Sequence, residues 1–149
     1  MTRLAQLFQN QVLWVTLAAW LVAQTIKVLL LISRQHQFDS RWIMGTGGMP
    51  SAHSACVSAL ATGVGLKMGF HTAGFAVALI FALVTMFDAQ GVRRAAGRQA
   101  VVLNKIIDEL YVKGQISEGR LKELIGHTPI EVFVGGLIGC SMAVMLCRS

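Results

Sequence analysis

The nine residues GGMPSAHSA, at positions 47–55, separate two long apolar stretches and mark the start of the second one. Pro50 and Ser51 are typical of a helix start, and the apolar run continues from them to about Phe70. A turn between two hydrophobic helices needs less polarity than two serines and a histidine provide. The stretch therefore predicts two things, the N-terminus of a helix and a polar site that is built on it.

Charged residues are scarce in this chain, and their positions indicate membrane helices. Of the 149 residues, 54% are hydrophobic and only 13% are charged, whereas about 25% of an ordinary soluble domain is charged. Four stretches carry no charge at all: 4–26, 42–66, 68–87 and 132–147. A helix that crosses a bilayer takes roughly 20 mostly apolar residues. Since each stretch approaches or reaches that length, we expect an integral membrane protein.

The expected fold is all-α, a small polytopic helix bundle that forms a single membrane-embedded domain over residues 1–149. We expect four transmembrane helices, at about 12–33, 54–70, 72–89 and 130–146. Between the last two, apolar residues recur every three or four positions in the segment 99–126, which predicts two amphipathic helices. Such helices lie along the membrane surface. The pattern leaves open whether the bundle assembles into a homo-oligomer.

Two other classes of site fit the composition less well. Cys56, Cys140 and Cys147 are odd in number and lie in apolar stretches, which favours buried thiols over disulfides or a metal site. The net charge of +6 is typical of some nucleic-acid-binding proteins, but basic residues that flank membrane helices explain it better. We therefore expect membrane lipids, and no nucleic acid, as partners.

Four crossings bring four helix ends to one side of the membrane: the end of the first, the start of the second, the end of the third and the start of the fourth. The ionisable side chains on that side include Lys27, Arg34, His53, Asp88, Arg93, Arg94, His127 and Glu131. Ten of the 13 basic residues lie toward the same side, so the positive-inside rule favours the cytosol. The convergence predicts one shared polar site.

Helix capping explains some of the polar residues on this side but leaves the two histidines unexplained. Ser51 is suited to cap the second helix. Thr128 and Glu131 are typical of a capping box at the fourth. Neither cap explains His53 or His127. Glu131 follows His127 by four residues, so its carboxylate can instead hold the imidazole, and we do not expect both uses of Glu131 to be optimal at once.

The cations of this side suit a phosphate ester. Lys27 and Arg34 are seven residues apart and so share one side of the first helix. Arg34 is also explained by the headgroup boundary, whereas Lys27 lies deeper and is expected to face a polar interior. Arginines and helix N-termini hold phosphate oxygens, one histidine can attack phosphorus, and the other can protonate the leaving oxygen. A divalent cation fits less well because these cations would repel it.

Three stretches of the chain resemble the divergent bacterial and plastid branch of the type-2 phosphatidic acid phosphatase and vanadium haloperoxidase superfamily. They are GGMPSAHSA, DAQGVRRAAGRQA and GHTPIEV. The superfamily pattern is K-x6-R-P, then P-S-G-H, then S-R-x5-H-x3-D. Lys27 and Arg34 match the first motif, with Gln35 in place of its proline. The second motif is matched by Pro50, Ser51 and His53, with Ala52 in place of its glycine.

The third motif is matched only at its end, by His127 and by Glu131, which is a longer acid than the usual aspartate. Its S-R half is not matched at the expected spacing. Our hypothesis is that Arg93 or Arg94 supplies the missing guanidinium, since both are expected on the same side of the membrane. Asp88 is expected to pair with one of these arginines and to support the site.

The resemblance implies a metal-independent phosphatase that needs no cofactor and is inhibited by vanadate. His127 would be the nucleophile, Glu131 its orienter and His53 the general acid. Phosphate would be bound by Lys27, Arg34, Ser51 and the backbone N–H groups of Ala52 and His53. Gly47 and Gly48 would let the backbone turn tightly over the phosphate. Membrane embedding favours a lipid or polyprenyl phosphate or diphosphate as substrate, in a bacterial cell membrane.

Two other functions remain open. A non-catalytic membrane protein could bind anionic lipid headgroups through the same cations, and it would not need His127. A small transporter would use Asp88 within the membrane, and Asp88 would then matter more than either histidine.

Overall fold

The computed structural model describes residues 3–36, 48–91, 97, 99–107 and 127–147. The described part of the chain is helical and contains no strand, so the all-α prediction is confirmed. Five helices have defined bounds: α1 (Arg3–Phe8), α2 (Gln11–Gln35), α4 (Ala52–Met68), α5 (Ala73–Gln90) and α7 (Pro129–Leu146). The long helices begin and end within two residues of the expected positions.

A polar side chain caps the start of every long helix. The caps are Asn10, Ser51, Thr72 and Thr128, and each side-chain oxygen accepts a backbone N–H from the first turn. A cap of this kind contributes about 1 kcal/mol in water. Near the hydrocarbon of a bilayer a missing cap costs more, because no water is present there to bond the unsatisfied backbone N–H groups. The caps therefore explain why polar residues border these apolar helices.

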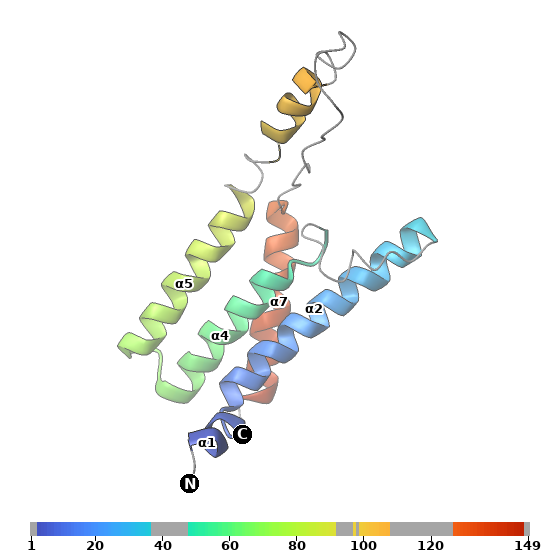
Figure 1. The fold of residues 1–149 in the computed structure, drawn as a ribbon. Coiled ribbons are helices and arrows are strands. Elements are labelled where there is room, and N and C mark those ends of the chain that lie inside the picture. The colour runs from blue at the N-terminus through green and yellow to red at the C-terminus, as the bar shows by residue number, and fades with distance from the viewer. Residues whose placement is uncertain (1–2, 37–47, 92–96, 98, 108–126, 148–149) are drawn as a thin grey trace.

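Helix α4 lies at the centre of the bundle and packs against α2, α5 and α7 (Figure 1). Within the described part of the chain, three helices are long and apolar enough to cross a membrane: α2, α5 and α7. At 17 residues, α4 is slightly shorter than these, and most of its residues are buried between its neighbours. The protein is thus an integral membrane protein in which three membrane-length helices surround a fourth.

Helices α4 and α7 approach each other closely because glycines line one face of α7. A Cβ atom on Gly135 would collide with the carbonyl oxygen of Ser51. One turn later, a Cβ on Gly139 would collide with the carbonyl oxygen of Ala55. Small residues four apart are a common device for bringing membrane helices together. The pattern GGLIG in α7 was a signal for this contact that the prediction of four separate helices did not use.

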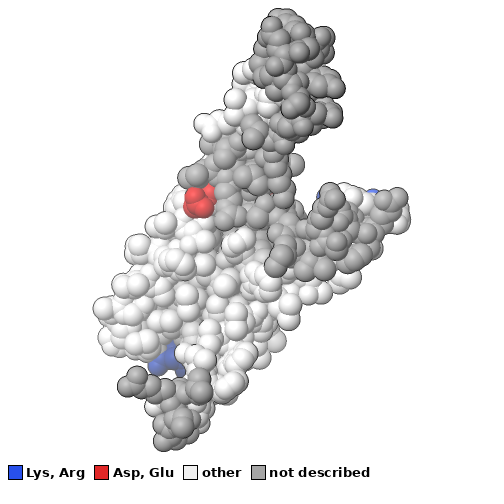
Figure 2. Space-filling view, in the orientation of Figure 1, with Lys and Arg blue, Asp and Glu red and all other residues white. Residues whose placement is uncertain are grey.

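The outward faces of the bundle are apolar. Exposed large side chains on the outer helices include Val77, Ile80 and Phe81 of α5 and Phe133 and Leu137 of α7. Figure 2 shows the described surface as mostly white, with blue and red groups only toward its two ends. Such a surface suits hydrocarbon between two charged boundaries.

The first part of the amphipathic segment expected at 99–126 is described, and residues 99–107 are helical. In Figure 1 this helix lies beyond the end of α5. Val102, Leu103 and Ile106 are exposed on it, whereas Ala100 and Asn104 are buried. The rest of the segment, 108–126, lies outside the described residues.

A short helix that was not expected, α1, folds against the start of α2 at the opposite end of the bundle. The indole N–H of Trp14 donates to the carbonyl of Phe8 at 3.0 Å, and the two rings stack with centroids 6.2 Å apart. The Gln11 amide donates to the carbonyl of Leu146, which ties the start of α2 to the end of α7. Aromatic side chains with a polar atom suit a membrane–water boundary.

Candidate functional site

The starts of α4 and α7 and the end of α5 meet at one end of the bundle, and backbone hydrogen bonds hold the first turn of α7 between α4 and α5. The Ser51 N–H donates to the Glu131 carbonyl at 3.0 Å, which joins the start of α4 to α7. The His127 N–H donates to the Ala89 carbonyl at 3.2 Å, which joins the end of α5 to the residue before the α7 cap. The first turn of α7 is therefore fixed from two sides.

His127 is buried and paired with Glu131. The residue is 3% exposed, and its Nδ1 lies 3.1 Å from Oε2 of Glu131. An ionised carboxylate can only accept, so a neutral His127 ring donates its Nδ1–H in this pair and keeps the lone pair on Nε2. The arrangement supplies an oriented imidazole with a basic nitrogen, which is what a nucleophile or a general base requires.

The same oxygen of Glu131 also completes the cap of α7. The Thr128 N–H donates to Oε2 of Glu131 at 3.1 Å, and the Glu131 N–H donates to Oγ1 of Thr128 at 3.4 Å. The expected conflict between capping and holding His127 is therefore wrong. Oε2 of Glu131 accepts from both His127 and Thr128, because His127, the residue before the cap, lies on the same side of the first turn of α7.

The hydroxyl of Ser51 serves the start of α4. Ser51 is fully buried, and its Oγ accepts the backbone N–H of Ser54 at 3.4 Å and the hydroxyl of Ser54 at 3.0 Å. Ala52 is buried and His53 is exposed in the first turn of the same helix. Ser54 was missed by the sequence reasoning, although it stands in the quoted stretch three residues after Ser51. The structure thus places Ser51 first of all as a helix cap.

Two cations of α2 face different surroundings. The side chain of Lys27 is buried at 4% exposure, one turn after Ala23 on the face of α2 that packs on Ala52 and Ala55. Its methylenes pass beside Gly48, where a Cβ would lie 3.5 Å from Cγ of Lys27. Gly48 has a φ of 88°, a backbone conformation that favours glycine. Arg34 is exposed near the end of the helix. Lys27 therefore belongs to the interior and Arg34 to the rim.

A cavity of about 290 Å³ lies between α2 and the first turn of α7 and brings three expected site residues together. These residues are Arg34, Gly48 and Glu131. The other residues that line this α2/α7 groove are Leu30, Leu31, Met49, Thr128 and Ile130. One cation, the carboxylate that holds His127 and an apolar wall thus share one space, which is suited to an anion that carries an apolar chain.

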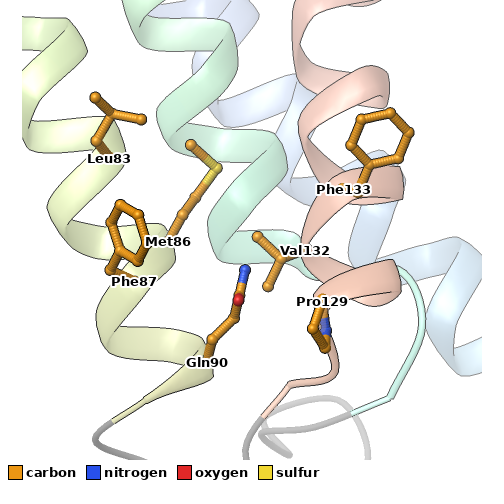
Figure 3. A pocket seen from close by; sticks show the side chains of 7 residues that line it. All are labelled: Leu83, Met86, Phe87, Gln90, Pro129, Val132 and Phe133. Atoms are coloured by element: carbon orange, nitrogen blue, oxygen red, sulfur yellow. The ribbon is translucent and has the colours of Figure 1, made fainter.

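A second cavity, of about 370 Å³, lies between α5 and α7 (Figure 3). In Figure 3, Leu83, Met86 and Phe87 of α5 stand opposite Val132 and Phe133 of α7. Gln90 and Pro129 line the end of this α5/α7 groove. This groove was not predictable from sequence, because its residues are ordinary for apolar helices and only packing decides where a space remains.

Several expected site residues are not placed in the α2/α7 groove. Asp88 is half-buried near the end of α5. Gly47, Arg93 and Arg94 lie outside the described residues, and so does the hypothesis that one of these arginines replaces the missing guanidinium. Within the described ranges, no group of three His, Cys, Asp or Glu side chains is arranged to hold a metal ion.

Comparison with known proteins gives matches over nearly the whole chain. The sequence pattern of the Divergent PAP2 family matches residues 8–142, which include every expected site residue. The uncharacterized membrane protein YuiD of Bacillus subtilis (strain 168) is 45% identical over an alignment that covers 95% of this chain and 96% of that protein. No solved structure matches the chain.

Proposed function

Because this chain belongs to the Divergent PAP2 family, we propose that it is a metal-independent membrane phosphatase for a lipid or polyprenyl phosphate or diphosphate. The observation that carries the proposal is the buried His127 ring, whose Nδ1 is held by Glu131 at 3.1 Å. A helix cap needs Thr128 and Glu131 but gives no reason for a histidine there. The α2/α7 groove beside this pair, with Arg34 on its rim, supports an anionic substrate.

The proposed reaction has two steps. Nε2 of His127 attacks phosphorus, the bond from phosphorus to the leaving oxygen breaks, and His53 gives its proton to that oxygen. A phosphohistidine results, and Glu131 stabilises the positive charge that develops on the ring. Water then attacks phosphorus and loses a proton to His53, the P–N bond breaks, and phosphate leaves with His127 restored.

The chain's own cations and helix ends bind the phosphoryl oxygens in this proposal. Arg34 offers a planar pair of donors at the rim, and Lys27 adds a buried positive charge. The N-terminus of α4 adds the backbone N–H groups of Ala52 and His53, which follow the Ser51 cap. No metal or cofactor takes part in either step.

The test is phosphate release by the purified protein in detergent. The substrates are phosphatidate, phosphatidylglycerophosphate and polyprenyl phosphates and diphosphates, each with and without EDTA and with and without vanadate. We expect release that survives EDTA, falls with vanadate and is lost in His127→Ala. His71→Ala is the matched control, because His71 is an exposed histidine in the turn between α4 and α5, at the other end of α4. Release by His127→Ala equal to that of the wild type would refute the mechanism.

A second candidate function is the binding of anionic lipid headgroups without catalysis. One observation favours it: hydrogen bonds of Ser51 and Glu131 also serve to cap α4 and α7. In that case no lipid phosphate would be hydrolysed, and the wild type and His127→Ala would bind such lipids equally well. The same panel, read by lipid binding as well as by phosphate release, separates the two functions.

A further inference from the structure

The α2/α7 groove has two chemically different walls. Its polar wall consists of Arg34, Thr128 and Glu131, at the end of α2 and in the first turn of α7. Its apolar wall includes Leu30, Leu31 and Ile130. Leu30 is one turn before Arg34 on α2, so the apolar wall extends from the cation toward the middle of the membrane.

The apolar wall is open to the surface that faces lipid. Ile130 is 67% exposed and Leu30 is 43% exposed, and both lie on helices that are long and apolar enough to cross a membrane. The groove lies between the last turns of α2 and the first turn of α7. A molecule in the bilayer can therefore reach the groove from the side, without passing through water.

We infer that the α2/α7 groove holds a hydrocarbon chain of the lipid phosphate, with the phosphate toward Arg34 and the start of α7. This inference rests on the proposed function and adds where the substrate lies and which residues select it. Arg34 stands where the anionic head would be and the leucines where the chain would be. The carboxylate of Glu131 also lines the groove, but its Oε2 is engaged by the Thr128 N–H and by Nδ1 of His127. Leu30 of α2 and Ile130 of α7, which line the groove from its two helices, then determine which chains fit.

The α5/α7 groove is the competing place for the chain, and its lining argues against it. It is larger, but among the described residues that line it none is charged, and Gln90 is the one polar side chain of that set. If the hydrocarbon chain lay in the α5/α7 groove, no cation among the described lining residues would pair with the phosphate. The α5/α7 groove therefore provides matched controls for substitutions in the α2/α7 groove.

The test is photo-cross-linking with a probe that cannot be hydrolysed, an alkylphosphonate of 16 carbons with a diazirine on its chain. The wild type, Leu30→Trp and Leu83→Trp are placed in phosphatidylcholine nanodiscs, irradiated, and mapped by mass spectrometry with and without excess unlabelled hexadecylphosphonate. Only adducts that the competitor removes are counted. We expect them on residues 28–35 and at Ile130, reduced about tenfold in Leu30→Trp, which fills the groove, and unchanged in Leu83→Trp.

Competable adducts on α5 instead, or their loss in Leu83→Trp but not in Leu30→Trp, would overturn the inference. The absence of any competable adduct in the wild type would also overturn it. Ile130→Trp narrows the groove from the α7 side, so it repeats the test if Leu30→Trp does not fold. Since the probe is never cleaved, competable adducts on α2 in a protein that hydrolyses no lipid phosphate would support the chain site while refuting the phosphatase.

Discussion

A single carboxylate oxygen of Glu131 joins the fold of α7 to the proposed chemistry. It accepts from the Thr128 N–H and from Nδ1 of His127, each at 3.1 Å. An ionised carboxylate has lone pairs for both bonds. The cap fixes the position of the carboxylate, and the carboxylate fixes the imidazole, so the orientation of His127 depends on the helix start and not on a loop.

Glu131→Gln separates the charge of this side chain from its capping role. The amide still offers an oxygen to the Thr128 N–H, but it no longer stabilises positive charge on His127. We expect phosphate release to fall by at least about a hundredfold, with little change in the midpoint of thermal unfolding. Thr128→Ala is the matched control and should cost about 1 kcal/mol of stability with a smaller effect on release. Full activity of Glu131→Gln would reduce Glu131 to a cap.

His53 is tested through the leaving group. If His53 protonates the leaving oxygen, His53→Ala should slow the hydrolysis of an alkyl lipid phosphate by about 10²- to 10⁴-fold. An aryl phosphate that releases p-nitrophenolate needs no such proton in the first step, so the first-turnover release of p-nitrophenolate should be affected much less, although the second step still uses His53. First-turnover rates for both esters are compared in the wild type, His53→Ala and His71→Ala. Equal losses with the two esters would argue against a proton donor at position 53.

At the scale of elements, the contact between α4 and α7 decides the geometry of the site. Gly135 and Gly139 let α7 approach the backbone of α4 at Ser51 and Ala55. The Ser51 N–H then reaches the Glu131 carbonyl. Because the start of α4 and the first turn of α7 are joined in this way, a change in the helix spacing would move the expected phosphate-binding amides away from His127.

Gly139→Ala should destabilise the bundle more than Gly136→Ala. The added methyl at position 139 meets the backbone of α4, which can move only if the helices separate, and overpacking of this kind costs about 1–3 kcal/mol. At position 136 the nearest atom is Oγ of Ser58 at 3.4 Å, an ordinary contact. Thermal unfolding in detergent measures both variants. Equal stabilities would mean that the two helices are not held at this distance.

The helices were predictable from sequence because their apolar lengths and polar caps are local features. Ser51 and Thr128 marked the starts of α4 and α7 within two residues. The central place of α4 was not predictable in the same way, since which faces meet depends on the shapes of distant residues such as Ala55 and Gly139. The two grooves are also products of packing. Spacing brought Lys27, Arg34 and Glu131 to one end of the bundle. The depth of Lys27 in the apolar stretch also distinguished it, as the buried cation, from Arg34 on the rim.

For the whole molecule, the site and the chain termini lie at opposite ends. Figure 1 marks both termini at the end of the bundle that is distant from the start of α7. A cytosolic site, as the basic residues favour, would therefore place both termini outside the cell. We expect a C-terminal alkaline phosphatase fusion to be active in a bacterial host and a C-terminal green fluorescent protein fusion to be dark. The reverse pair of results would place the site on the outer face.

The packing of α4 against α7 also has a consequence for how the protein is made. Ser51, Ala55 and Ala59 of α4 are covered by α7, which leaves the ribosome after α2, α4 and α5. Until α7 has been made, these small side chains and backbone carbonyls of α4 are not covered by the glycine face of α7. A nascent chain that stops before α7 therefore has an open centre, and quality-control proteases should recognise it, whereas the chain that extends through α7 closes that centre from within.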